Sequence, residues 1–257
     1  MCPPKYFEIN YEINPWMHID DQPSKKKAEE EWENLKKIYE SLGVDVEVIE
    51  SQEGCPDMVF VANAGLPANG KFILSNFTYP ERKKEEKYFN DYFEDKFEIV
   101  ELPKEVNFEG QGDAFFVKDK LFLGCGFRSS REAKEEIKKH IHKSIEVVQL
   151  NLINSKFYHL DTALAYLGGG NFLVVKSAFS EDSIEELKKH GNLIFLSEED
   201  ADYFSANCIV YKDKIIMNNA TGELEEKLKS LGLTLVKTNA SEFLKSGGAV
   251  RCLSLVC

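Results

Sequence analysis

One pattern of elements recurs along the chain, and it constrains the fold more than any other feature of the sequence. The segment FVKDKLF at 116–122 matches VYKDKII at 210–216 almost in register. Around both segments the apolar spacing predicts two strands, a helix and a third strand, with a period of roughly 45 residues. Repeats of this length indicate duplicated modules, each of which buries its apolar face only against its neighbours.

Four such units are predicted in full, and the fifth is divided between the two ends of the chain. The strands are expected within 58–62, 72–77, 97–102, 112–126, 145–150, 158–164, 172–176, 193–196, 208–218 and 233–236. The helices are expected at 80–95, 130–143, 180–190 and 221–231. The fifth unit would combine a strand after Ala249, strands at 5–13 and 44–49, and a helix from Ser24 to Gly43.

A closed ring of these units would place each first strand near a common axis. The sequence therefore predicts an α/β protein with one domain over 1–257, a five-bladed α/β propeller of ββαβ units around a central active site. The alternative is an ordinary mixed α/β sheet.

Composition narrows the classes of partner. A net charge of −12 disfavours nucleic acid and anionic membrane surfaces, and it suits a small cationic ligand. No N-terminal stretch has the apolar core of a signal peptide, and no apolar run approaches the ~20 residues of a membrane span. We expect a cytoplasmic chain. The six cysteines are scattered without C-x-x-C spacing, so we expect free thiols and neither a zinc site nor a disulfide framework.

Three short motifs carry chemistry together: FEGQGD at 108–113, YHLDT at 158–162 and GGAVRC at 247–252. A nucleophilic cysteine needs a base, the base needs an orienting carboxylate, and a cationic substrate needs further carboxylates around it. Each motif alone has an ordinary structural explanation. Cys252 precedes an apolar run, which is typical of a buried small side chain on a strand. His159 alone is typical of a structural histidine. Arg82 lies within ERKKEE, which is typical of a solvated helix face.

The combination resembles the guanidine-modifying hydrolases, the superfamily of arginine deiminase and dimethylarginine dimethylaminohydrolase. The resemblance covers essentially the whole chain and is greatest for the arginine dihydrolase branch, through NPWM at 14–17, DMVFVANAG at 57–65, YPER at 79–82, GFR at 126–128 and HLDTAL at 159–164. It implies the five-bladed pentein propeller. Cyanobacterial members of that branch carry a further C-terminal domain, and because this sequence stops at Cys257 we expect that domain's activity to be absent.

The resemblance also implies roles for individual residues. Cys252 would be the nucleophile, His159 the general acid and base, and Glu109 the carboxylate that partners His159. Asp57 and Asp161 would hold the guanidinium edges, and Arg82 and Arg128 the substrate α-carboxylate. The remaining substrate-binding positions are expected at Asn14, Asn63, Asp113, which supports the Glu109 turn, and Ala249. No metal or other cofactor is expected.

Asn63 separates the subfamilies, because deiminases and dimethylarginine hydrolases have a carboxylate at the matching position whereas dihydrolases have asparagine. An amide can donate and accept, so Asn63 could hold a neutral urea for a second attack. The sequence therefore predicts hydrolysis of L-arginine to ornithine, ammonia and carbon dioxide. A single-step deiminase, a hydrolase of methylated arginine, an amidinotransferase and a non-enzymatic binding scaffold stay open as alternatives. The expected partner is a small guanidine compound, and a homo-oligomer is possible.

Overall fold

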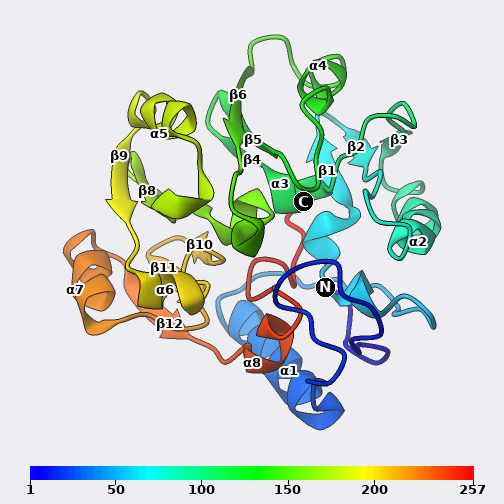
Figure 1. Ribbon diagram of the computed structural model, residues 1–257, viewed down its shortest axis with the longest axis horizontal. Coiled ribbons are helices and arrows are strands. Elements are labelled where there is room, and N and C mark those ends of the chain that lie inside the picture. Colours follow the sequence, from blue (N-terminus) through cyan, green and yellow to red (C-terminus); the bar gives the residue numbers. More distant parts are fainter.

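The computed structural model describes residues 1–257, and it contains four separate three-stranded sheets arranged around a centre (Figure 1). In each sheet the first two strands pair antiparallel and the second and third pair parallel, with a helix in the crossover. This is the ββαβ unit that the sequence predicted. No helix combines the length and the apolar character needed to cross a membrane.

The four units follow one another along the chain. The first contains β1 (Gly65–Ala68), β2 (Lys71–Leu74), α2 (Lys83–Phe93) and β3 (Glu98–Val100). The second contains β4 (Ala114–Val117), β5 (Lys120–Cys125), α4 (Ala133–Lys138) and β6 (Glu146–Asn151). The third contains β7 (Leu164–Gly168), β8 (Asn171–Val174), α5 (Glu181–Lys188) and β9 (Asn192–Phe195). The fourth contains β10 (Ile209–Tyr211), β11 (Lys214–Met217), α7 (Gly222–Ser230) and β12 (Thr234–Lys237).

The two hairpins that matched in sequence also match in backbone conformation. Lys118 and Lys212 both adopt a φ of 55°, in the left-handed region that two-residue hairpin turns require. The antiparallel registers correspond as well, since Val117 pairs with Lys120 and Tyr211 pairs with Lys214. The internal repeat is therefore structural as well as sequential.

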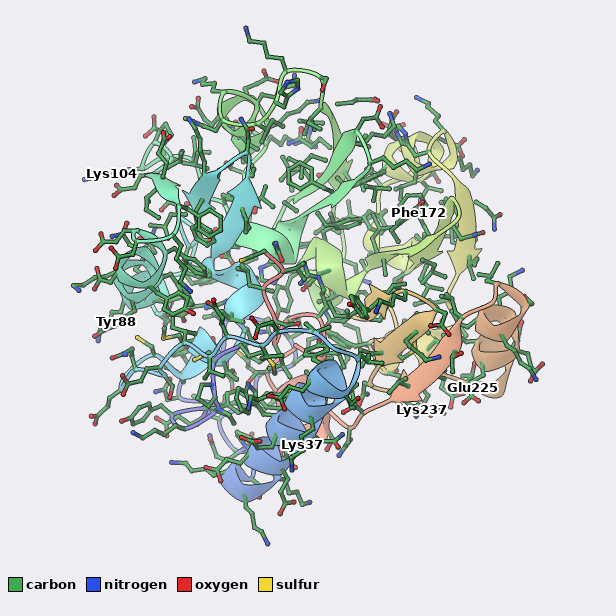
Figure 2. All side chains as sticks on the ribbon, turned by 180° about the vertical axis from the view of Figure 1, so that it is seen from behind. Lys37, Tyr88, Lys104, Phe172, Glu225 and Lys237 are labelled. Atoms are coloured by element: carbon green, nitrogen blue, oxygen red, sulfur yellow. The ribbon has the colours of Figure 1, made fainter.

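Adjacent units bury their apolar faces against each other. Phe122 and Leu150 of the second unit pack with Phe172 and Val174 of the third in one apolar cluster. Phe172 lies in the interior, whereas the charged side chains labelled in Figure 2 lie at the outer rim, among them Lys37 and Lys104. The helices α2, α4, α5 and α7 lie outside their sheets (Figure 1).

The sector between the fourth unit and the first is built differently. It holds α1 (Lys25–Ser41), whose buried face includes Trp32 and Leu35 as the helical spacing predicted, and α8 (Ser241–Leu244) (Figure 1). Apolar clusters join this sector to both neighbours: Trp32 shares one with Ile216, and Ile49 shares another with Phe72. None of its segments is a strand, so the strands expected at 5–13, at 44–49 and after Ala249 were wrong.

Local hydrogen bonding explains one of these differences. The Gln22 side chain donates to the Ile9 carbonyl at 2.6 Å and accepts from the Ile9 N–H at 3.1 Å, so it occupies the groups that a partner strand would use.

Short helical turns replace two more expected strands. Residues 58–62 fall in the 3₁₀ turns Pro56–Val59 and Val61–Ala64, and Leu160–Thr162 precedes β7. A short, continuous apolar run cannot be assigned to strand or helix by periodicity, and that ambiguity applied here. The other short helices are α3 (Gly110–Asp113), α6 (Glu198–Asp202), Ser155–Phe157 and Lys176–Ala178.

Candidate active site

The predicted nucleophile lies in a turn and not on a strand. Gly247 precedes this turn with a φ of 74°, and a Cβ atom there would lie 2.9 Å from the Tyr158 hydroxyl, so glycine is required. The Cys252 carbonyl accepts a hydrogen bond from the N–H of Ala62 at 3.1 Å. This bond joins the nucleophile turn to the turn that carries Asn63.

Cys252 is 3% exposed, and two side chains reach its sulfur. Its Sγ lies 3.3 Å from Asp161 Oδ2 and 3.1 Å from Asn207 Nδ2. Burial raises the pKa of the Cys252 thiol well above its usual value, and the Asp161 carboxylate raises it further. The backbone of Ala249, which is itself buried, and the Asn207 amide favour the thiolate.

Glu109 and His159 form a buried pair. His159 Nε2 lies 2.8 Å from Glu109 Oε2, and Arg128 Nη1 donates to the same oxygen at 3.1 Å. Burial opposes ionisation of Glu109, but Arg128 and His159 outweigh it and hold the pKa of this carboxyl well below its usual range. Glu109 is therefore a carboxylate at neutral pH and can orient the His159 ring.

Arg128 is stacked between two aromatic rings. Its guanidinium lies 4.7 Å from the ring centre of Tyr79 and 4.4 Å from that of Tyr158. Its Nη2 donates to the Ile13 carbonyl at 3.1 Å. The stacking and these bonds fix the plane of the guanidinium.

Arg82 is 3% exposed, so the solvated helix face that ERKKEE alone would indicate is wrong. It forms a two-pronged ion pair with Glu85, with Nε to Oε1 at 2.9 Å and Nη2 to Oε2 at 2.7 Å. Its Nη1 donates to Asn63 Oδ1 at 2.9 Å, and its Nη2 donates to the Asp57 carbonyl at 3.1 Å. Asn63 Nδ2 in turn donates to the Glu109 carbonyl at 3.2 Å.

Two carboxylate oxygens in the site have no hydrogen-bond partner. They are Asp57 Oδ1 and Asp161 Oδ1, both completely shielded from solvent. Tyr11 donates to the other Asp57 oxygen at 3.0 Å. Burial raises the pKa of Asp57, and it raises the pKa of Asp161 to about 7, although Arg251 partly offsets the latter shift. Buried polar atoms are normally paired, so both oxygens point to a missing donor.

Asp113 lies behind the pair of Glu109 and His159. Its Oδ1 accepts from the Leu160 N–H at 3.0 Å, and its Oδ2 accepts from the Ser129 hydroxyl at 2.6 Å. The same hydroxyl accepts from the Glu109 N–H at 3.1 Å. Burial raises the pKa of Asp113 to about 6. These bonds connect the turn that carries Glu109 to the turn that carries His159.

A glycine provides the space between these turns. A Cβ atom at Gly112 would lie 2.1 Å from Asn63 Nδ2 and 3.4 Å from the His159 ring. Any side chain there would displace Asn63.

Asn14 joins the N-terminal segment to the nucleophile turn. Its Nδ2 donates to the Tyr158 hydroxyl at 3.2 Å and to the Ser246 carbonyl at 3.1 Å. Its Oδ1 accepts from the Trp16 N–H at 2.9 Å. Hydrogen bonds thus link the predicted site residues other than Ala249, directly or through neighbouring side chains and backbone groups, with Asn14 at the edge of this network.

Sequence reasoning missed four residues of this network: Tyr11, Glu85, Tyr158 and Asn207. Glu85 was detectable, because it follows Arg82 at the i+3 spacing that allows an ion pair on a helix. Tyr158 was also detectable, because it precedes His159 in the YHLDT motif. Tyr11 and Asn207 reach the site from distant segments, and no local pattern in the sequence identifies them.

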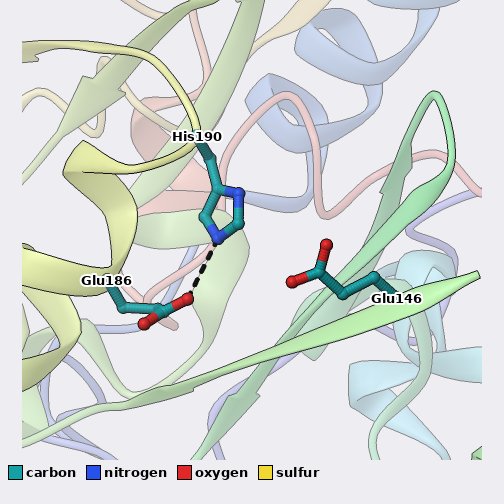
Figure 3. A group of neighbouring side chains, drawn as sticks. All are labelled: Glu146, Glu186 and His190. Atoms are coloured by element: carbon teal, nitrogen blue, oxygen red, sulfur yellow. Dashed lines mark hydrogen bonds and ion pairs between the residues drawn. The ribbon is translucent and has the colours of Figure 1, made fainter.

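A second group of titratable side chains lies at the rim, between the second and third units (Figure 3). One ligand atom from each of Glu146, Glu186 and His190 lies within 4.8 Å of the others, a spacing that could hold a metal ion. Lys120 and Lys189 already pair with the two carboxylates, and Glu186 lies 3.2 Å from His190 Nε2. This arrangement is that of a surface ion-pair group, and no residue of the Cys252 site takes part in it.

Known proteins resemble this chain in sequence and in fold. The chain is 40% identical over 262 residues to the bifunctional arginine dihydrolase/ornithine cyclodeaminase ArgZ of Synechocystis sp., an alignment that covers 99% of this chain and 37% of that protein. The chain therefore spans about a third of the length of this relative. It is 34% identical to the N(G),N(G)-dimethylarginine dimethylaminohydrolase of Mycobacterium tuberculosis, over 99% of this chain and 84% of that protein.

The structural comparison agrees with the sequence comparison. The crystal structure of the N-terminal domain of ArgZ bound to its substrate superimposes with a TM-score of 0.94 at 39% identity, covering 99% of this chain and 96% of that one. Residues 3–255 match the model of the family described as N,N dimethylarginine dimethylhydrolase, eukaryotic. The resemblance predicted from the motifs is confirmed, and the chain belongs to this family of guanidine-modifying proteins.

Proposed function

We propose that this chain is a cysteine-dependent hydrolase of the guanidinium group of L-arginine. The observation that carries the proposal is the pair of buried carboxylate oxygens without a donor, Asp57 Oδ1 and Asp161 Oδ1, in the same site as Cys252. A guanidinium is a planar cation with N–H donors along its edges, so it can supply both missing hydrogen bonds and neutralise both charges.

The first half of the reaction replaces an amino group by sulfur. The Cys252 thiolate attacks the guanidinium carbon, and His159 gives a proton to the departing nitrogen, which leaves as ammonia. The product of this step is a thiouronium on Cys252. His159 then takes a proton from a water molecule that attacks the same carbon, and the electron pair of the S–C bond returns to sulfur with release of citrulline.

The second half repeats the attack on the bound urea. Asn63 has one amide N–H and one oxygen lone pair beyond the bonds to Glu109 and Arg82, so it can serve a neutral urea as well as a cation. The second attack expels ammonia and leaves a thiocarbamate on Cys252. Its hydrolysis gives ornithine and carbon dioxide, so one arginine and two waters yield one ornithine, two ammonia and one carbon dioxide.

Substrate charge favours the first attack. Burial and Asp161 hold the Cys252 pKa high in the unliganded site, which keeps the sulfur protonated. A guanidinium beside Asp161 adds a positive charge in a buried site, where electrostatic interactions are strong. The thiolate therefore becomes more favourable when the substrate is present.

The predicted carboxylate clamp rests more on Arg128 than on Arg82. Arg82 uses Nε, Nη1 and both hydrogens of Nη2 on Glu85, Asn63 and the Asp57 carbonyl. Arg128 uses only Nη1 and Nη2 once each, and a guanidinium has five N–H donors. Arg128 therefore has more donors left for a substrate carboxylate.

The relatives support both the chemistry and the main alternative. The N-terminal domain of ArgZ has been crystallised bound to its product and covalently bound to a reaction intermediate. The M. tuberculosis relative and the family model favour a second candidate, a single-step hydrolase that releases citrulline from a methylated arginine. We also infer that the sector holding α1 and both termini is the fifth blade of the propeller, since apolar clusters join it to both neighbours.

Product analysis tests the proposal. The chain is incubated with arginine, with citrulline and with asymmetric dimethylarginine, and amino acids and ammonia are quantified by mass spectrometry and enzymatic assay. Ornithine and ammonia in a ratio of one to two, with citrulline also consumed, is the expected result. Citrulline as the end product supports the single-step candidate, and no turnover of any of the three contradicts both.

The control is Cys252→Ser, whose hydroxyl is far less ionised than a thiol at neutral pH. It should lower turnover by at least about 10⁴-fold, because removing one member of a catalytic unit costs between about 10⁴-fold and about 10⁶-fold in kcat. An acid quench of the wild-type reaction should leave an adduct on the peptide that contains Cys252. An adduct on another cysteine would move the site.

A further inference from the structure

Asn207 contacts the nucleophile and has no role in the mechanism described above. It lies between α6 and β10 and is completely buried. Its Nδ2 donates to Cys252 Sγ at 3.1 Å and to the Asp161 carbonyl at 3.0 Å. Its Oδ1 accepts from the N–H groups of Arg251 at 2.9 Å and Cys252 at 3.3 Å.

These neighbours fix the orientation of the amide. The side-chain oxygen faces two backbone N–H donors, and the side-chain nitrogen faces the Asp161 carbonyl. A flipped amide would place N–H against N–H and oxygen against oxygen. An N–H donor is therefore directed at the sulfur, and the same side chain holds the backbone of the nucleophile turn.

Two buried groups act on the sulfur in opposite directions. Asp161 Oδ2, 3.3 Å away, favours a protonated thiol that donates to it. The Asn207 N–H favours a thiolate that accepts from it, and hydrogen bonds to a charged acceptor are about twice as strong as those between neutral groups. The contact also favours the return of the electron pair to sulfur when the S–C bond breaks in each hydrolysis step.

We propose that Asn207 is a catalytic residue whose amide donates to the Cys252 sulfur and stabilises the thiolate, both before attack and when it leaves. The identity of the reaction rests on the function proposed above, but the effect on the sulfur does not. The two can therefore be tested separately.

The substitution Asn207→Asp tests the donor. Aspartate keeps an oxygen for the Arg251 and Cys252 N–H groups, but it places an acceptor with negative charge where the amide donor contacts sulfur. The matched control is Asn218→Asp in the same unit: Asn218 Nδ2 donates to the Tyr203 carbonyl at 3.0 Å, and its Oδ1 accepts from the Ala240 N–H at 3.0 Å. Asn218 thus bridges backbone groups in the same way but has no bond to a sulfur.

The measurement is the pH dependence of Cys252 alkylation by iodoacetamide, read from the mass of the peptide that carries Cys252. We expect Asn207→Asp to raise the midpoint by about one pH unit or more, because a negative charge in place of a hydrogen-bond donor disfavours the Cys252 thiolate. We expect kcat for arginine to fall more than about tenfold with KM changed less than about threefold, because the contact is made to the nucleophile. Asn218→Asp should leave the midpoint unchanged.

Two further readouts cover a variant that does not fold. Asn207→Ala removes the donor without adding charge and should also raise the midpoint. In the wild-type chain, the Asn207 side-chain amide proton should change its NMR chemical shift at the pH of Cys252 ionisation, and Cys252→Ala should remove that change. An unchanged alkylation midpoint in a folded variant, an equal shift in Asn218→Asp, or an amide signal that ignores the ionisation would each overturn the inference.

The outcomes separate the two proposals. If the wild type hydrolyses arginine but Asn207→Asp has the wild-type midpoint of Cys252 alkylation, the role of Asn207 is refuted and the proposed function is not. A shifted midpoint in a chain that leaves arginine intact supports the role of Asn207 and refutes the proposed substrate.

Discussion

The two halves of the site treat their negative charges in opposite ways. In the paired half, Glu109 lies against Arg128 and His159, and its pKa is held well below the usual range. In the unpaired half, Asp57 and Asp161 each keep one buried oxygen without a donor, and their pKa values are raised. A carboxylate that works as part of the protein is neutralised by the protein.

Under the proposed function, a carboxylate that binds a cation is left for the ligand to neutralise. The unpaired carboxylates should therefore lower the unfolding free energy of the unliganded protein, and a bound cationic substrate should offset this loss. Mutations in the two halves should therefore change the free energy of unfolding with opposite signs.

The largest effect is expected from Glu109→Gln in the paired half. The substitution leaves Arg128 buried beside a neutral amide, and removing one partner of a buried ion pair costs about 3 to 5 kcal/mol. Urea titration should show this loss in the free energy of unfolding. Turnover should fall as well, because His159 loses the carboxylate that orients it.

A charge pair at the rim is the control for Glu109→Gln. Glu146→Gln removes the exposed partner of Lys120 and should change stability little, because solvent screens such pairs. Equal losses in the two variants would mean that the Glu109 pair is no more important than a surface contact.

The second effect concerns a substrate without a carboxylate. If Arg128 binds the α-carboxylate, agmatine should lose a charge-assisted pair worth about 2 to 5 kcal/mol, and its kcat/KM should lie about 30-fold or more below that of arginine. Equal kcat/KM values for the two compounds would show that the spare donors of Arg128 have another use.

The third effect has the opposite sign to the first. Burial raises the pKa of Asp161 from 3.8 to about 7, so the unfolding free energy should fall as pH rises from about 4 to about 7. Asp161→Asn removes this loss and should stabilise the unliganded chain by about 1 to 3 kcal/mol at pH 8, with little gain at pH 4. Arginine binding should weaken in the same variant. If Asp161→Asn is destabilised at pH 8, the unpaired carboxylate of Asp161 does not destabilise the unliganded fold.

The sequence predicted the regular parts of this molecule and missed the irregular ones, for one physical reason. In the four ββαβ units, the spacing of apolar residues along the strands and helices indicates which side chains are buried. The matched turns at Lys118 and Lys212 indicate the repeat. Elsewhere the backbone is held by single side chains such as Gln22 and Asn207, whose partners lie 13 and 44 residues away in the chain. No local pattern records such bonds, so the expected strand at 5–13 was wrong.

The site residues were accessible by a different route. Cys252, His159 and Glu109 were predicted because their motifs match a known family, whereas Asn207 contacts Cys252 only through the fold. Residue types alone would have placed Arg82 in solvent, although it is buried against Glu85. The motifs therefore lead to a proposed chemistry, whereas the charge balance around these residues is visible only in the structure.

The smallest and most specific effect is expected at Asn63, which lies between the two halves. Its Oδ1 accepts from Arg82 and its Nδ2 donates to the Glu109 carbonyl, so it is a neutral group among charged ones. Asn63→Asp is nearly isosteric and adds a negative charge beside the reacting carbon. That charge favours the cationic arginine over the neutral urea, so products should shift from ornithine toward citrulline.

The product ratio is the measurement that decides the role of Asn63, because a general loss of rate would show only a disturbed site. The matched control is Asn14→Asp, which changes an amide at the edge of the network to a carboxylate, away from the Glu109 carbonyl. It should alter rate without changing the ratio of ornithine to citrulline. If Asn63→Asp still converts arginine fully to ornithine, or if both variants shift the ratio equally, the neutral amide is not what holds the urea for its second hydrolysis.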